Sequence, residues 1–109
     1  MGEDLDRCLD PPLLVLTSLA GGPKHGYAIA QDVAETLGVR LSPGTLYGVI
    51  TRLDERGYIE PLPAEDRRRP YRITAAGAAE LRVQTARLRA VADLAAKRAR
   101  LIPRPAATS

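Results

Sequence analysis

The amino-acid sequence predicts a mainly α fold of the α+β class, with three short helices, a β-hairpin and a long final helix. Apolar residues recur at three- and four-residue intervals in four segments, each bounded by proline, glycine or a small polar residue. Between the third and fourth segments the pattern changes to two short alternating runs. With 109 residues, 45% hydrophobic composition and neither Phe nor Trp, the chain can bury one modest aliphatic core.

The first helix is expected from Pro11 to Ala20. Asp10 stands at the N-cap, and the first turn holds two prolines, where a missing N–H costs nothing. The glycines and proline of residues 21–23 end the helix. Its apolar positions are Leu13, Leu14, Leu16 and Leu19.

The second helix is expected from Gly26 to Leu37, followed by Gly38 as a C-terminal cap. The residues that recur at helical spacing are Tyr27, Ala30, Val33, Ala34 and Leu37.

The third helix has the strongest start signal, because Ser42 is a good N-cap and Pro43 suits the first helical position. Gly57 ends it, in the left-handed conformation that turns the chain toward a strand. One face is apolar: Leu46, Val49, Ile50 and Leu53. The other positions are small, hydroxyl-bearing or charged: Gly44, Thr45, Gly48, Thr51, Arg52 and Glu55. Such a face can approach another molecule closely.

Two alternating runs, residues 58–62 and 71–74, predict a β-hairpin, and the PAEDRRRP between them indicates a loop too long for a tight turn. Arginines lie at its tip. Pro61 and Pro70 restrict the strands to edges or ends of a sheet. Because a two-stranded ribbon is not stable alone, Ile59 and Ile73 are expected to pack on the helices.

The last helix is expected from Ala75 to Leu101, capped by Thr74, with residues 103–109 as a disordered tail. At 1.5 Å per residue it extends roughly 40 Å, more than a small core can cover. Its apolar seam is Leu81, Leu88, Val91, Ala92, Ala95, Ala99 and Ile102. We expect this seam to form a homodimer interface; the alternative is a solvent-exposed helix on a monomer.

Charge is distributed unevenly along the chain. Residues 1–60 hold five basic and nine acidic residues, whereas residues 61–109 hold eleven basic and four acidic ones. A basic second half favours a polyanionic partner, although a solvated basic helix would give the same count.

The order of helix, helix, capped third helix and arginine-tipped hairpin is that of a winged helix-turn-helix domain, here assigned to residues 1–74. The major groove of DNA, about 12 Å wide, admits one helix whose outward residues are small or polar. Arginines on the hairpin, the wing, would then reach phosphates or the adjacent minor groove.

Three segments carry a family resemblance: LVLTSLAGGPKHGYAIAQDV, LSPGTLYGVITRLDERGYIE and RRRPYRITAAG. Together they resemble the PadR-type transcriptional regulators over residues 13–80, and the small subclass with one C-terminal helix in particular. The resemblance implies a dimeric winged-helix repressor with a C-terminal dimerisation helix, residues 75–102. That helix lacks the aromatic residues with which small relatives bind ligands, so no ligand is predicted.

Candidate DNA contacts come from the third helix, the wing and the start of the second helix. They are Lys24, Tyr27, Ser42, Gly44, Thr45, Tyr47, Thr51, Arg52, Arg67, Arg68 and Arg69. Simpler interpretations remain: a core position for Tyr27, a partly buried ring for Tyr47 and ordinary solvated charges for the wing arginines.

Catalytic and metal sites are not expected. With Cys8 as the only cysteine and His25 as the only histidine, the chain cannot assemble a zinc site of the usual kind, and His25 more simply serves a helix-end hydrogen bond. No catalytic triad, phosphate-binding glycine loop or paired catalytic carboxylates is evident, so neither an enzyme nor a cofactor is predicted. No apolar run approaches a membrane span, which predicts a cytoplasmic protein.

The sequence therefore predicts a homodimeric, sequence-specific repressor that binds double-stranded DNA at an inverted-repeat operator, with an unknown small-molecule effector left open. The alternative is a winged helix that binds another protein and does not bind DNA.

Overall fold

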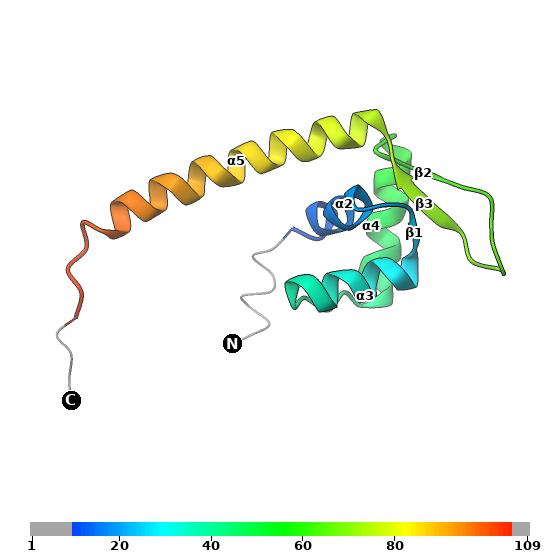
Figure 1. Cartoon of the computed structure of the whole chain (residues 1–109), viewed down its shortest axis with the longest axis horizontal. Coiled ribbons are helices and arrows are strands. Elements are labelled where there is room, and N and C mark those ends of the chain that lie inside the picture. The colour runs from blue at the N-terminus through cyan, green and yellow to red at the C-terminus, as the bar shows by residue number, and fades with distance from the viewer. Residues whose placement is uncertain (1–9, 106–109) are drawn as a thin grey trace.

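The computed structural model describes residues 10–105 and has the expected α+β fold, with four helices and one small sheet in this range (Figure 1). The helices are α2 (Pro11–Ala20), α3 (Gly26–Leu37), α4 (Pro43–Glu55) and α5 (Ala75–Ala99). The strands are β1 (Lys24–His25), β2 (Ile59–Pro61) and β3 (Pro70–Ile73). The interpretation of Cys8 and that of residues 106–109 as part of a disordered tail fall outside the described residues.

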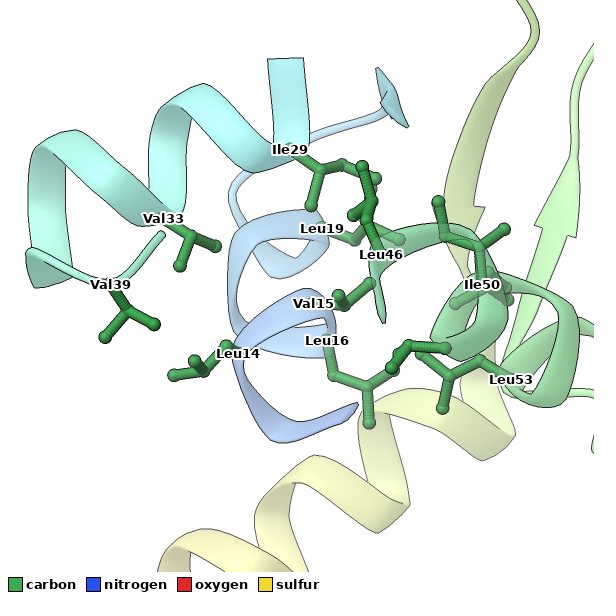
Figure 2. Close-up of a cluster of buried hydrophobic side chains, with 12 residues drawn as sticks. Leu14, Val15, Leu16, Leu19, Ile29, Val33, Val39, Leu46, Ile50 and Leu53 are labelled. Carbon is green, nitrogen blue, oxygen red and sulfur yellow. The ribbon is translucent and has the colours of Figure 1, made fainter. Parts of the chain in front are cut away.

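The core lies where α2, α3 and α4 meet, and it is built of aliphatic side chains only (Figure 2). Val15, Ile29 and Val49 are fully buried at its centre, and β2 adds Ile59 from the sheet. Twelve buried residues make up the core: Leu14, Val15, Leu16, Leu19, Ile29, Val33, Val39, Leu46, Val49, Ile50, Leu53 and Ile59.

In α3 the buried stripe is narrower than its sequence pattern predicts. Ile29 and Val33 are buried, but Tyr27 is 65% exposed and Leu37 is 47% exposed. The core interpretation of Tyr27 is therefore wrong. The physical reason differs for the two residues. Tyr27 lies about 100° around the helix from the buried Gly26, off the buried face, and Leu37 lies in the last turn, beyond the buried Val33.

The start and face of α4 agree with the sequence prediction. The Ser42 hydroxyl accepts a hydrogen bond from the Thr45 backbone N–H at 3.2 Å, which satisfies one unpaired donor of the first turn. All four residues of the predicted apolar stripe are buried. Gly57 then turns the chain in the left-handed conformation, with a φ of 77°.

The sheet has one more strand than the sequence predicted. Its order is β1-β3-β2, with both neighbouring pairs antiparallel. Lys24 pairs with Tyr71 across β1 and β3, and Ile59 pairs with Ile73 across β2 and β3. The two-residue strand β1 is too short to show any alternation, so only the folded chain reveals that it extends the hairpin and ties it to α3.

The wing tip contains a tight turn, so the prediction of a loop without one is wrong. Glu65 and Arg68 exchange two backbone hydrogen bonds, of 2.7 and 2.8 Å, and the two residues between them have positive φ angles of 48° and 68°. These are the features of a type I′ turn, whose twist matches that of the flanking strands. Asp66 and Arg67 adopt this conformation without a glycine.

A cluster of close contacts joins α4, the wing and α5. Thr74 caps α5 by accepting a hydrogen bond from the Gly77 N–H at 3.1 Å, and its hydroxyl donates to the Gly57 carbonyl at 2.6 Å. The Thr74 N–H donates to the Tyr58 carbonyl at 3.0 Å. Gly77 is buried so tightly that a Cβ there would lie 2.0 Å from the Tyr58 carbonyl oxygen.

Only the first part of α5 packs on its own chain. Leu81 is half-buried against the core, whereas every residue from Ala86 to the end of the described range is exposed. Figure 1 shows this second half extending beyond the helical core. The helix ends at Ala99, two residues before the predicted end, so Ile102 lies outside it.

We expect Gly77→Ala to lower the free energy of unfolding by about 3 kcal/mol or more, because the added methyl group would overlap backbone that cannot move aside. Urea unfolding followed by circular dichroism measures this loss.

The matched control is Gly48→Ala, because no atom lies within 4 Å of a Cβ at that exposed position in α4. Here the free energy of unfolding should rise by about 1 kcal/mol through higher helix propensity. Equal stability of the two variants would contradict the packing of Gly77.

We also expect Asp66→Val to speed hydrogen exchange at the Glu65 and Arg68 amides by about tenfold, because a β-branched residue resists a positive φ by about 1–2 kcal/mol. Asp66→Asn should leave exchange unchanged, since Asn tolerates this conformation. NMR exchange rates at the two amides measure the effect, and protection retained in the valine variant would argue against the turn.

Candidate nucleic-acid interface

The outward face of α4 is exposed and carries little bulk at its two glycines. The candidate residues on it are all exposed: Ser42, Gly44, Thr45, Tyr47, Thr51 and Arg52. Apart from neighbouring residues and the backbone of α4 itself, no atom lies within 4 Å of a Cβ placed at Gly44 or Gly48. The face is therefore open to the approach of a partner along its first three turns.

Two of these hydroxyl groups already have partners within α4. Ser42 Oγ donates to Thr45 Oγ1 at 3.0 Å, and Thr51 Oγ1 donates to the Tyr47 carbonyl at 2.9 Å. Each hydroxyl oxygen still has lone pairs, so both can accept a hydrogen bond from a base or a water.

Tyr47 connects α4 with the start of α3. A Cβ at Gly26 would lie 2.8 Å from the Tyr47 hydroxyl oxygen and 3.0 Å from two ring carbons, so the ring rests on the glycine backbone. The side chain is nevertheless 51% exposed. Tyr47 is thus partly covered and oriented, with about half of its surface available to a ligand.

The wing brings arginines to the same region. A hollow of about 210 Å³ lies between the start of α3, α4 and the wing. Its lining residues are His25, Gly26, Tyr27, Tyr47, Arg67, Arg68, Arg69 and Tyr71. Five of the eleven predicted DNA contacts therefore meet around one hollow. The other three lining residues, His25, Gly26 and Tyr71, were not among the predicted contacts.

Lys24 is held differently from the wing arginines. Its ammonium group donates to the Ser18 carbonyl at 2.6 Å and to the Gly22 carbonyl at 3.2 Å. The side chain thereby closes the turn between α2 and α3. A contact between Lys24 and a phosphate would compete with these two bonds.

His25 has the helix-end hydrogen bond that the sequence predicted. Its Nδ1 accepts from the Ala28 N–H at 3.3 Å, at the N-cap of α3. Its Nε2 lies 3.3 Å from Arg68 Nη1, although the two residues are 43 positions apart. Nothing in the sequence indicated this contact, because it depends on β1 pairing with β3.

The wing carries four arginines, against the three carboxylates of Glu60, Glu65 and Asp66. The only salt bridge among residues 10–105 joins Arg72 to Glu60 across β2 and β3, at the base of the wing. The three arginines nearer the tip are exposed, and Arg69 donates to the Leu62 carbonyl at 2.9 Å.

Within the described part of the chain, no group of three or more His, Cys, Asp or Glu side chains could hold a metal ion. Each helix in residues 10–105 is too short or too polar to form a membrane span.

The residues of the predicted dimer seam fall into two groups. Leu81 packs partly on its own core, while Leu88 and Val91 are 53% and 67% exposed. Ala92, Ala95 and Ala99 continue the seam on the exposed half of α5, and Ile102 follows its end.

The helical core, the sheet that carries the wing and the exposed face of α4 define a winged helix-turn-helix protein. The model of the Transcriptional regulator PadR-like family matches residues 15–83. The chain belongs to this family of transcriptional regulators.

Two curated relatives are similar to part of the chain. The chain is 45% identical over 71 residues to an uncharacterized 37.1 kDa protein in transposon Tn4556 of Streptomyces fradiae, covering 65% of this chain and 21% of that protein. It is 35% identical over 80 residues to the transcriptional activator GvpE2 of Halobacterium salinarum, covering 72% of this chain and 40% of that protein. The chain thus spans less than half the length of either relative.

Solved structures show the same architecture. A transcriptional regulator from Clostridium thermocellum superposes with a TM-score of 0.72 at 26% identity, over 80% of this chain and 87% of the other. A PadR family transcriptional regulator from Eggerthella lenta gives a TM-score of 0.67 at 30% identity, over 78% of this chain and 73% of the other.

Proposed function

We propose that this protein is a sequence-specific DNA-binding repressor that acts as a homodimer. The observation that carries the proposal is the meeting of the exposed α4 face, the start of α3 and the wing arginines around one hollow. Membership of a family of transcriptional regulators supports it.

The shapes of the two elements suit different parts of DNA. Gly44, Thr45 and Gly48 add little bulk to α4, so the helix can enter the major groove, about 12 Å wide, and bring Tyr47 to base edges. The wing carries three consecutive arginines at and after its tip turn, beside Glu65 and Asp66, and these arginines suit the flanking phosphates. In this arrangement α4 provides specificity and the wing provides affinity.

Dimerisation through α5 would bury the apolar groups that the monomer leaves in solvent. Leu88 and Val91 lie one helical turn apart on the exposed half, with alanines that allow close helix packing. A twofold dimer presents two α4 helices, so the operator would be an inverted repeat with half-sites about one helical turn apart or a multiple of it.

Repression would follow from occupancy of a promoter by the dimer. Release would require a change at the α5 interface, or an effector, that alters the separation of the two α4 helices. One relative is named a transcriptional activator, and the same DNA contacts would activate if the operator lay upstream of the promoter.

The competing function is a winged helix that recognises another protein. Such a module would have little use for three consecutive arginines beside a small-residue helix face. A gel shift with DNA from upstream of the protein's own gene, at two salt concentrations, separates the two functions. A verified dimer that retains none of these fragments would rule out the repressor.

We expect Tyr47→Ala to weaken operator binding by about tenfold or more and to leave random-DNA binding nearly unchanged, because the ring is oriented on the α4 face. Arg68→Ala should weaken binding to all DNA similarly and lower the salt-dependence slope by about 0.9, as expected for one lost phosphate contact. Fluorescence anisotropy with operator and scrambled duplexes gives both quantities. Equal losses from the two variants on both duplexes would refute this division.

We expect Val91→Glu to convert the dimer to a monomer at tens of micromolar, because it would bury a charge in the seam. The matched control is Ala86→Glu, which adds the same charge on the opposite side of α5, about 200° from Leu88. Sedimentation equilibrium measures both. A wild-type monomer, or dissociation by both variants alike, would contradict the α5 interface.

A further inference from the structure

His25 faces Arg68 in an arrangement that leaves two donors without an acceptor. The imidazole Nδ1 accepts a hydrogen bond from the Ala28 N–H, so in the neutral ring the proton is on Nε2. Arg68 Nη1, which can only donate, lies 3.3 Å from that Nε2. The two groups therefore point N–H bonds into the same space.

The opposite tautomer would be less favourable. If Nε2 accepted a hydrogen bond from Arg68, the ring proton would be on Nδ1 and would face the Ala28 N–H. That N–H lies in the first turn of α3, where no intrahelical acceptor exists. That backbone group is half-buried, whereas Arg68 is exposed and can bond to water or to a ligand. The cap bond consequently fixes Nε2 as a donor.

The surroundings of the donor pair select an anion. The hollow that both residues line contains three arginines, three tyrosines, a histidine and a glycine, and no carboxylate. His25 and Arg68 also border a second cavity, which is lined by Lys24, Glu65 and Asp66. Among residues 10–105 neither carboxylate forms a salt bridge with Arg68 or His25.

We propose that His25 Nε2–H and the Arg68 guanidinium together bind the oxygens of a single DNA phosphate in this hollow, which makes His25 a DNA-binding residue. The inference rests on the proposed function. The hollow is also lined by Tyr47 of α4, so a phosphate bordering the groove that α4 enters would lie within reach of the pair. One phosphate would thus bridge the start of α3 and the wing.

The test uses His25→Asn, because the Asn oxygen can still cap α3 but its side chain lacks a ring N–H near Arg68. Arg68→Gln and the double variant complete a double-mutant cycle. Each protein is measured on a series of operator duplexes in which one phosphate, at a different position in each duplex, is replaced by an uncharged methylphosphonate. His25→Asn should weaken operator binding about tenfold with an unchanged melting temperature. The double variant should lose less than the product of the two single losses.

One methylphosphonate position per half-site should weaken the wild type about tenfold, yet leave Arg68→Gln and His25→Asn nearly unaffected. The scan of Arg68→Gln alone remains informative if His25→Asn fails to fold. If the affinity losses of the two single variants multiply, or if no methylphosphonate position is shared by the two residues, the shared phosphate site is ruled out. The proposed DNA binding itself is not affected by this outcome. If wild-type protein binds no duplex, the proposed function fails together with it.

A free anion is the remaining occupant of this hollow. Titration with inorganic phosphate, followed by NMR shifts of the His25 ring, distinguishes it from a DNA phosphate. If the His25 signals shift at millimolar phosphate and neither variant changes operator affinity, the hollow binds a free anion, and the proposal is overturned.

Discussion

The contact between Gly77 and the Tyr58 carbonyl determines how the parts of this molecule join. A side chain on Gly77 would overlap that carbonyl, so only glycine lets α5 begin directly against the wing. Thr74 completes the junction by bonding to Gly57, Tyr58 and Gly77. As a result the end of α4, the base of the wing and the first turn of α5 form one continuous unit. Any change in the direction of α5 would therefore be transmitted to α4 and the wing together.

Helix boundaries could be predicted well because local chemistry determines them. Ser42 and Thr74 cap their helices through the expected hydroxyl groups, and Gly38 and Gly57 have the left-handed conformation that ends a helix. The errors arose where the structure depends on distant contacts. β1 is two residues long and exists because β3 is beside it. The wing-tip turn lacks the glycine that normally signals its type, so no sequence pattern indicated it.

The candidate site divides in the same way. The polar face of α4 could be predicted because it is the complement of the buried stripe, which helical spacing reveals directly. The approach of His25 to Arg68 could not, since it requires the register in which His25 pairs with Pro70. Tyr47 lies between these cases. Its position on α4 predicted exposure, but its contact with Gly26 depends on the angle between α3 and α4.

The self-contained wing tip has an evolutionary consequence. Its turn is closed by hydrogen bonds between Glu65 and Arg68 alone, and its base is fixed by the pairing of Ile59 with Ile73. Tyr71, near the base, packs against the core, but residues 62–69 take no part in it. Substitutions and paired insertions there can accumulate at little cost to folding. The wing is thus the part of this scaffold in which new contact surfaces can arise by mutation while the helices keep their sequence.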